Sequence, residues 1–182
     1  MWLRTKVLPV LAATAPNVAV HPMTMISPQL RDAIGVWHDQ GPPSFPIDKS
    51  DIRRWAIATY WPEEPPRLFW DEDHARTTRW GGIIAPDDFN PFAWPVPRTE
   101  PGPLAYLPQR GEAGQKLLNG GVELRFDQPM RPGDTISRRW RVKDASERDG
   151  RLGRMLYIRI ERQFHNQHGQ RVRTQIDTLI RY

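Results

Sequence analysis

The sequence predicts a single α+β domain in which a long antiparallel sheet packs over short helices. Residues 121–182 contain segments of alternating apolar and polar residues separated by turn residues, which is typical of strands that bury one face. Residues 42–108 hold 13 of the 19 prolines, so only short helices fit there. The apolar face of the sheet must be covered, and these helices are the elements available to cover it.

Three short helices are predicted before the sheet. Residues 48–59 begin with Asp48, a residue type that caps helix N-termini, and continue with apolar residues at helical spacing. Residues 71–80 begin with acidic residues and end with arginines, which matches the helix dipole. Residues 83–94 place Pro86 and two aspartates near their start, which predicts a third helical segment.

Four strands are predicted in the second part of the chain. They occupy residues 121–134, where a Pro-Gly turn ends the strand, then 135–150, 154–164 and 171–180. The residues that share one face of the last three strands are Ile136, Trp140 and Val142, interrupted by Arg138; Leu156, Ile158, Ile160 and Phe164; and Val172, Thr174, Ile176, Thr178 and Ile180. A hairpin signal lies at Asp149-Gly150. Strands joined by hairpins predict an antiparallel meander with one buried face.

Composition restricts the class of protein and its chemistry. The absence of cysteine excludes disulfides, thiolate metal sites and a cysteine nucleophile, and it fits a cytoplasmic location. No run of about 18 apolar residues is present, so we expect no membrane partner. We expect residues 1–25 to form an N-terminal extension, either disordered or preceding a native start, and residues 26–182 to form the domain.

The C-terminal third of the chain is basic. Residues 121–182 hold 14 Lys/Arg against 8 Asp/Glu, whereas residues 1–120 hold 12 against 13. Such a charge suggests nucleic acid, an acidic protein surface or a phosphorylated small molecule as a partner, or simply the solvated face of a sheet. Acidic residues interrupt the run and no nucleic-acid-binding signature is present, so we expect no nucleic-acid partner. The basic residues that would form such a surface are Arg138, Arg139, Arg141, Lys143, Arg159, Arg162, Arg171 and Arg173.

Several motifs follow one another along residues 26–182. They are ISPQLRDAIG (26–35), DIRRWAIAT (51–59), FWDEDHAR (69–76), RWGGIIAPDDFNPF (79–92), PMRPGDTISRRWRV (129–142) and ERDGRLGRMLYIRIERQFHNQHGQRV (147–172). Each motif alone is weak, but their order resembles the MaoC-like dehydratases, specifically their N-terminal domain of the fatty-acid-synthase dehydratase type. The resemblance implies a single hotdog domain, in which an antiparallel sheet wraps around a central helix.

The resemblance also implies an activity and a partner. Members of this family are hydro-lyases of fatty-acid or lipid metabolism that hydrate 2-enoyl thioesters of coenzyme A or acyl carrier protein reversibly. They work in pairs of hotdog domains, as homodimers or heterodimers, and need no cofactor. Catalytic members carry a motif of the type Gly-Asp-x-Asn-Pro-x-His, whose Asp and His activate a water. A backbone N–H at the start of the central helix polarises the thioester carbonyl.

The chain departs from this motif in the stretch YWPEEPPRLFWD, residues 60–71. Tyr60 and Trp61 stand where Gly-Asp is expected, and Leu68 or Phe69 stands where His is expected. None of these four positions holds the Asp or His of the motif. The start of the expected central helix reads Ala-Pro-Asp at residues 85–87, and its carboxylate would disfavour a developing oxyanion. The resemblance therefore predicts a degenerate site.

The predicted role is that of a partner that shapes the acyl-binding tunnel of an enoyl-CoA hydratase or 3-hydroxyacyl-thioester dehydratase, while a second hotdog subunit supplies the catalytic Asp and His. An alternative is an active homodimeric hydratase, or a thioester-binding protein, that uses non-standard residues. The residues expected to bind the acyl group are Trp61, Phe69, Trp70, Ile84, Phe89, Asn90 and Phe92, although such aromatics serve equally well as core.

Four residues are weaker candidates for catalysis. Asp71 and His74 are three residues apart on a predicted helix, so the carboxylate could orient the imidazole, although a surface pair is the commoner role. Glu63 and Glu64 lie among prolines and aromatics, where burial would raise a carboxyl pKa, although exposure to solvent is the commoner outcome. No metal site is predicted.

Overall fold

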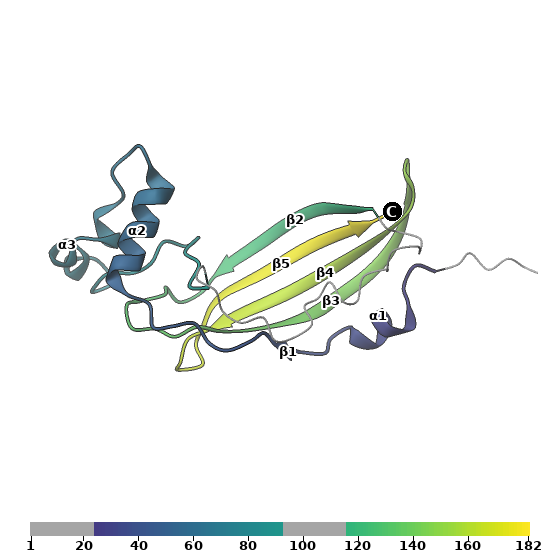
Figure 1. Ribbon diagram of the computed structural model, residues 1–182, viewed down its shortest axis with the longest axis horizontal. Coiled ribbons are helices and arrows are strands. Elements are labelled where there is room, and N and C mark those ends of the chain that lie inside the picture. Colours follow the sequence, from purple (N-terminus) through teal and green to yellow (C-terminus); the bar gives the residue numbers. More distant parts are fainter. Residues whose placement is uncertain (1–23, 93–115) are drawn as a thin grey trace, which may run out of the picture.

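The computed structural model describes residues 24–92 and 116–182, and it is built on a five-stranded antiparallel sheet (Figure 1). The helical elements are α1 (Pro28–Ala33), α2 (Lys49–Tyr60), the 3₁₀ helix η1 (Arg67–Phe69) and α3 (Glu72–Thr77). The strands are β1 (His38–Asp39), β2 (Leu117–Phe126), β3 (Ser137–Gly150), β4 (Gly153–His165) and β5 (Arg171–Arg181). The predicted α+β class is confirmed. The expected extension over residues 1–25 lies almost wholly outside the described residues.

The order of the strands in the sheet is β1-β3-β4-β5-β2. β3, β4 and β5 form the predicted meander. A simple succession of hairpins would also pair β2 with β3, but this pairing does not form. β2 pairs antiparallel with β5 instead, with Phe126 opposite Arg173 and Leu117 opposite Arg181. The segment 127–136 carries the chain from one side of the sheet to the other, and this leaves β2 at an edge.

The β3–β4 hairpin turns later than its sequence signal predicts. β3 continues through Asp149 and Gly150, and Gly150 pairs with Gly153 across a two-residue turn. Gly153 has a φ of 94°, a conformation that favours glycine, so the second glycine rather than the Asp-Gly pair closes this hairpin. The turn predicted between β4 and β5 is confirmed, and Asn166 stabilises it by accepting the backbone N–H groups of His168 and Gln170.

Apolar residues of β3 and β4 share one face of the sheet, against which α1 packs. Trp140, Val142, Leu156, Ile158 and Ile160 are at most 1% exposed there and contact Leu30 and Ala33 of α1. We call this side the α1 face. The register places Ile176 and Ile180 on the opposite side, because they pair with Glu161 and Tyr157, whereas Leu179 pairs with Ile158 on the α1 face. The prediction of one shared apolar face is therefore wrong for β5.

The two predicted helices that form are capped as expected. Asp48 accepts the N–H of Ser50 at 2.7 Å at the start of α2, and Asp71 accepts the N–H of His74 at 3.0 Å at the start of α3. The third predicted helix is wrong over residues 83–92, which form turns, whereas residues 93–94 lie outside the described residues. The N–H of Ala85 donates to the Met130 carbonyl at 2.8 Å, a bond that holds this segment extended against the β2–β3 link.

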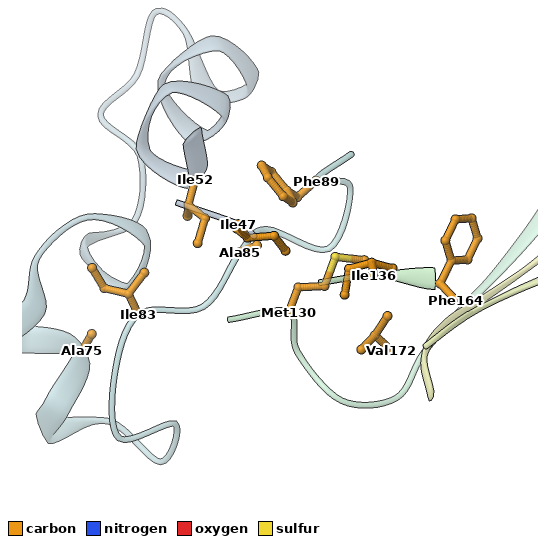
Figure 2. Packing of buried hydrophobic residues seen from close by; sticks show 10 residues of the cluster. All are labelled: Ile47, Ile52, Ala75, Ile83, Ala85, Phe89, Met130, Ile136, Phe164 and Val172. Atoms are coloured by element: carbon orange, nitrogen blue, oxygen red, sulfur yellow. The ribbon is translucent and has the colours of Figure 1, made fainter. Parts of the chain in front are cut away.

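Buried apolar side chains form two clusters. The first, which we call the α1-face cluster, consists of the buried residues of α1, β3 and β4 on the α1 face. The second, which we call the end cluster, joins the helical segments to the ends of the strands, and Figure 2 shows its members converging from both. Figure 1 shows that α2 and α3 lie beyond one end of the strands rather than across the middle of the sheet. The end cluster comprises Ile47, Ile52, Ala75, Ile83, Ala85, Phe89, Met130, Ile136, Phe164 and Val172.

A buried carboxylate lies on the side of the sheet opposite α1. Glu161 accepts two hydrogen bonds from Arg141, at 2.9 and 2.7 Å, and one from Gln163 at 3.0 Å. Burial raises the pKa of Glu161, but these hydrogen bonds and the charge of Arg141 outweigh it, so the pKa lies below its ordinary value of 4.5. The pair therefore stabilises the fold above about pH 4.5, and this contribution is lost as the pH falls through the lowered pKa.

We expect Glu161→Gln to lower the free energy of unfolding at pH 7 by about 1–3 kcal/mol, because a charge-assisted hydrogen-bonded pair is broken. The difference from the unsubstituted protein should shrink as the pH falls below 4.5, because the native carboxyl is then neutralised as well. Urea unfolding at pH 7 and at successively lower pH measures both quantities. Glu64→Gln, at an exposed carboxylate, serves as the control and should change stability little at any pH. A difference that does not depend on pH would contradict the prediction.

Candidate functional site

Residues 61–64, where the catalytic motif of the family is expected, extend into solvent. Trp61 follows the last residue of α2, and its side chain is 78% exposed. Glu63 and Glu64 follow it and are also exposed. Within the described part of the chain, Trp61 and the two glutamates therefore face solvent. Any contact of Trp61 with an acyl group requires a surface that another molecule supplies.

Asp71 and His74 come together as predicted, but in a structural arrangement. Asp71 is the N-cap of α3: its Oδ1 accepts the backbone N–H of His74, and its Oδ2 accepts two hydrogen bonds from Arg67, at 3.0 and 2.6 Å. The backbone hydrogen bond from His74 and the bonds from Arg67 hold the pKa of Asp71 below its usual range. The carboxylate is thus engaged as a helix cap, and the bond that it makes to His74 reaches the backbone rather than the imidazole.

The remaining aromatic candidates divide between core and turn. Phe69 packs against the end cluster and lies 6.0 Å from the ring of Tyr60, whereas Trp70 donates its indole N–H to the Pro65 carbonyl at 2.9 Å. Phe89 is 4% exposed, and its ring meets the edge of Trp55 at 5.6 Å. These contacts give the residues structural roles in this chain.

Residues 89–92 lie against the sheet at the end of β4. Asn90 accepts the N–H of Phe92 at 3.0 Å, which fixes the turn. The ring of Phe92 lies 6.3 Å from that of Phe164, and the guanidinium of Arg138 covers Phe92 at 4.1 Å. Phe89 and Phe92 thus hold the turn on the strands, where Phe92 contacts the guanidinium of Arg138.

The first two residues of the turn at 85–87 offer no free backbone donor. The N–H of Ala85 is bonded to Met130, and Pro86 has no N–H. Asp87 follows, and this residue is exposed. A negative charge at this place opposes the development of an oxyanion. Neither Ala85 nor Pro86 therefore has an N–H available to polarise a thioester carbonyl.

A cavity of about 310 Å³ lies beside this turn, between it and the β2–β3 link. Among the predicted site residues, only Ile84 lines it. Sequence reasoning did not assign the others to a site, because they come from separate segments that no local signal connects. They include Arg79, whose guanidinium stacks on the ring of Trp80 at 4.4 Å. The remaining lining residues are Ala85, Pro86, Asp87, Phe126, Asp127, Gln128, Pro129, Met130 and Val172.

The basic residues of the strands do not form one surface. Arg141, Arg159 and Arg171 bond to carboxylates, at 2.7 Å from Glu161, 2.8 Å from Glu123 and 2.8 Å from Asp127 respectively. The register places Arg138, Arg162 and Arg173 on the α1 face, whereas Arg139, Arg141 and Arg159 lie on the other. A phosphate-tracking surface requires unpaired cations side by side, so this arrangement does not favour a nucleic-acid interface.

Within the described ranges, the residues were compared with the requirements of a metal site and of a membrane-spanning helix. No group of three or more His, Asp or Glu side chains within residues 24–92 and 116–182 is arranged to hold a metal ion. None of the helices in the same ranges has the length and hydropathy needed to cross a membrane.

The five-stranded antiparallel sheet has the hotdog fold of the MaoC-like dehydratases. The chain belongs to the family described as FAS1-like, dehydratase domain region, whose model matches residues 32–175. No curated protein matches the chain by sequence.

Solved structures with the same fold include the following three. The ChsH1-ChsH2 complex from Mycobacterium tuberculosis has 17% identity and a TM-score of 0.66, covering 85% of this chain and 87% of that one. The MaoC-like dehydratase from Rhodospirillum rubrum has 21% identity and a TM-score of 0.59, covering 84% and 95%. The HadBC 3R-hydroxyacyl-ACP dehydratase complex from M. tuberculosis has 18% identity and a TM-score of 0.56, covering 82% and 97%. At these identities the likeness concerns the fold.

Proposed function

We propose that this chain is the degenerate subunit of a two-subunit enoyl-thioester hydratase or 3-hydroxyacyl-thioester dehydratase. It contributes a wall of the acyl-binding site, and a second hotdog subunit contributes the Asp and His that activate water. The substrate is a thioester of coenzyme A or acyl carrier protein, and the reaction adds water across its 2,3 double bond. Two of the structural neighbours, ChsH1-ChsH2 and HadBC, are complexes, which supports a paired arrangement.

One observation carries the proposal: a hydratase fold in which the water-activating position holds groups that cannot exchange protons. Trp61 is exposed there, and Phe69 packs against the core. The nearest titratable substitutes have other tasks, because Asp71 caps α3 and Glu63 and Glu64 face solvent. General acid–base catalysis needs a side chain within hydrogen-bond reach of the reacting atoms. A partner chain that holds this pair would supply it.

The edge of the sheet supports a partner subunit. β2 lies at the edge of the described sheet, and all ten of its residues are exposed. Leu117, Leu118, Val122, Leu124 and Phe126 give this strand an apolar character that solvent does not favour. An exposed edge strand with unpaired N–H and C=O groups is a template for pairing with another strand. A second hotdog subunit adding its own edge strand here would cover both the backbone groups and the side chains.

The first experiment captures the protein at native level, measures the mass of the assembly and identifies the chains that co-purify. We expect a stoichiometric second hotdog chain that carries a Gly-Asp-x-Asn-Pro-x-His motif. An assembly that contains only this chain and hydrates 2-enoyl-CoA would refute the division of labour and favour the homodimeric alternative.

Kinetics of the complex then separate the roles of the two chains. Asp71→Asn keeps a side chain that caps helices, and together with His74→Gln it should leave kcat/KM for a 2-enoyl-CoA within about threefold. Replacing the motif Asp of the partner should lower kcat/KM by about a hundredfold or more, the usual contribution of a general acid or base. A hundredfold loss from Asp71→Asn with unchanged assembly would place the catalytic group on this chain.

A further inference from the structure

A second cavity, of about 240 Å³, lies where α2, α3 and the β2–β3 link meet. Its lining contains three cations, namely Lys49 of α2, Arg76 of α3 and Arg131 of the link, and one carboxylate, that of Glu72. Three positive charges against one negative charge give this lining a formal charge of +2. We call the space the cationic cavity. The other residues that line it are Gly81, Gly82, Ile83 and Pro132.

Backbone hydrogen bonds fix Arg131 beside the start of α2. The N–H of Gly133 donates to the Ile47 carbonyl at 2.8 Å, and the N–H of Ile47 donates to the Asp134 carbonyl at 2.9 Å. The Oδ2 of Asp134 also accepts the backbone N–H of Arg131 at 2.8 Å, which closes the turn. Ile47 lies two residues before Lys49 in the chain. The two cations therefore line one cavity because main-chain bonds hold their segments together, although like charges repel.

The carboxylate of Glu72 shows that an oxyanion fits between two of these cations. Its Oε1 accepts a hydrogen bond from Lys49 at 2.6 Å, and its Oε2 accepts one from Arg76 at 3.2 Å. The hydrogen bond and the charge of Lys49, and then the charge of Arg76, outweigh the desolvation of Glu72 and lower its pKa. The side chains of Glu72, Lys49 and Arg76 are 44%, 54% and 63% exposed, so their bonds can exchange with those of an entering anion. Arg76 also donates to Asp73 at 2.8 Å, so its charge is shared between two carboxylates.

The cationic cavity has room for more than this carboxylate. Its volume of about 240 Å³ is several times the roughly 30 Å³ that a water molecule occupies in the liquid. Gly81 and Gly82 form part of the wall without side chains, so a ligand can approach the main chain there. Gly81 has a φ of 66°, a conformation that favours glycine, so the backbone itself keeps this part of the wall free of a side chain.

The two cavities of the domain are lined by consecutive residues of the same two segments. Ile83 and Arg131 line the cationic cavity, whereas Ile84 and Met130 line the cavity of about 310 Å³ described above. The hydrogen bond from Ala85 to Met130 joins the two segments at this point. A ligand that places a charged group in the cationic cavity and extends past this pair of segments would therefore also contact residues of the larger cavity.

We propose that the cationic cavity binds a phosphate group of the ligand, and that its three cations hold this group while Glu72 competes for the same donors. Phosphate oxygens accept charge-assisted hydrogen bonds, which an arginine can donate in pairs and a lysine donates as a point charge. The proposal rests on the proposed function only in naming the bearer of the phosphate, which is the carrier of an acyl thioester. Coenzyme A bears a 3′-phosphate and a diphosphate, and acyl carrier protein bears a phosphate on its phosphopantetheine arm.

The test uses the full chain, with any co-purified partner, and compares the unsubstituted protein with Arg131→Met. Methionine is a long, unbranched side chain that has neither the charge nor the donors of arginine. Calorimetry at low ionic strength measures the binding of CoA, dephospho-CoA, phosphopantetheine, pantetheine and inorganic phosphate. Lys49→Met is a second variant, so that the result does not depend on one substitution. Arg53→Met is the matched control, because Arg53 is an exposed cation of α2 outside the lining of the cavity.

We expect Arg131→Met and Lys49→Met each to weaken the binding of the phosphate-bearing probes about tenfold or more, since each removes a charge-assisted hydrogen bond. The Kd of pantetheine, which has no phosphate, should change by no more than about twofold, as should every Kd in Arg53→Met, because an exposed charge outside the cavity is screened. Equal Kd values for the phosphate-bearing probes in the unsubstituted protein and in both variants would overturn the proposal. So would a failure of all these probes to bind the unsubstituted protein.

Glu72→Gln should change phosphate binding in the opposite direction. Glutamine has the same shape and still accepts a hydrogen bond from Lys49, but the competing negative charge is gone, so phosphate should bind about threefold or more tightly. An ion pair that serves only to fasten α2 to α3 gives a different pattern. Lys49→Met and Glu72→Gln would then both lower the Tm and leave the Kd of phosphate unchanged, and this result would overturn the proposal.

The probes also identify the bearer of the phosphate. A 3′-phosphate in the cavity makes CoA bind more tightly than dephospho-CoA, and Arg131→Met removes that difference. A phosphate at the pantetheine arm makes CoA, dephospho-CoA and phosphopantetheine weaken alike in Arg131→Met. Inorganic phosphate that binds and responds to Arg131→Met, while none of these three compounds binds, supports the cationic cavity and counts against the proposed function instead.

Discussion

Replacing Trp140 by alanine is expected to lower the free energy of unfolding by about 3–5 kcal/mol, the range found when large buried aromatics are truncated. Among residues 24–92 and 116–182, Trp140 is the largest fully buried side chain, at 1% exposure, and it lies on β3 within the α1-face cluster. Its ring stacks on His38 of β1 at 4.7 Å, so the substitution also weakens the attachment of β1 to the sheet. Because the surroundings of a truncated core side chain relax only partially, a cavity is added to the loss of buried area.

The chain provides a matched control for this substitution. Trp61→Ala removes the same side chain from a position that is 78% exposed, and it should change stability by no more than about 0.5 kcal/mol. Urea unfolding of both variants at pH 7 gives the comparison directly. Similar losses of unfolding free energy in the two variants would contradict the difference in burial between Trp140 and Trp61.

Charging the apolar edge of the sheet is expected to weaken assembly with the proposed partner subunit while leaving the domain folded. Val122 and Leu124 lie on β2 with about half of each side chain exposed, so the double substitution Val122→Lys/Leu124→Lys removes little buried area from the isolated domain. Lysines on an edge strand oppose pairing with another strand. If a second hotdog subunit pairs here, two charges at the centre of the interface should weaken association by about a hundredfold or more.

Native mass spectrometry and sedimentation of the complex measure this effect, and circular dichroism checks the fold of the variant. Leu152→Lys is the control, because Leu152 is 59% exposed in the β3–β4 turn, away from the edge strand. It should leave assembly intact. Assembly that survives Val122→Lys/Leu124→Lys would direct the search for the interface to another surface of the domain.

Strands β3, β4 and β5 follow their sequence predictions within two or three residues, because alternation of side chains reports burial of one face directly. The position of β2 could not be predicted in this way. Each of its residues is exposed, and its pairing with β5 joins segments about 50 residues apart, which no local pattern encodes. Hydrophobic alternation also could not assign the apolar face of β5, because its register with β4 decides on which side Ile176 lies.

The helix predicted over residues 83–94 illustrates a different limit. Pro86 and the two following aspartates suit a helix start, yet the backbone of Ala85 is bonded to Met130, so tertiary contacts override the local preference over residues 83–92. At the candidate site, the loss of the catalytic motif could be seen in residues 60–71, since it is a matter of residue identity. The burial of Arg173 could not be predicted from the sequence. An alternation of arginine with apolar residues is typical of a strand whose charged side faces solvent.

The separation of the apolar residues into an end cluster and an α1-face cluster has a consequence for how such a chain can diverge. The segment that replaces the catalytic motif is attached to the end cluster, whereas α1 and the central strands are held by the α1-face cluster. Substitutions and insertions near residues 60–71 therefore perturb one cluster and leave the packing of the other largely intact, since distant sites contribute to stability almost additively. A domain built in this way can accumulate changes near residues 60–71 while its sheet remains stable.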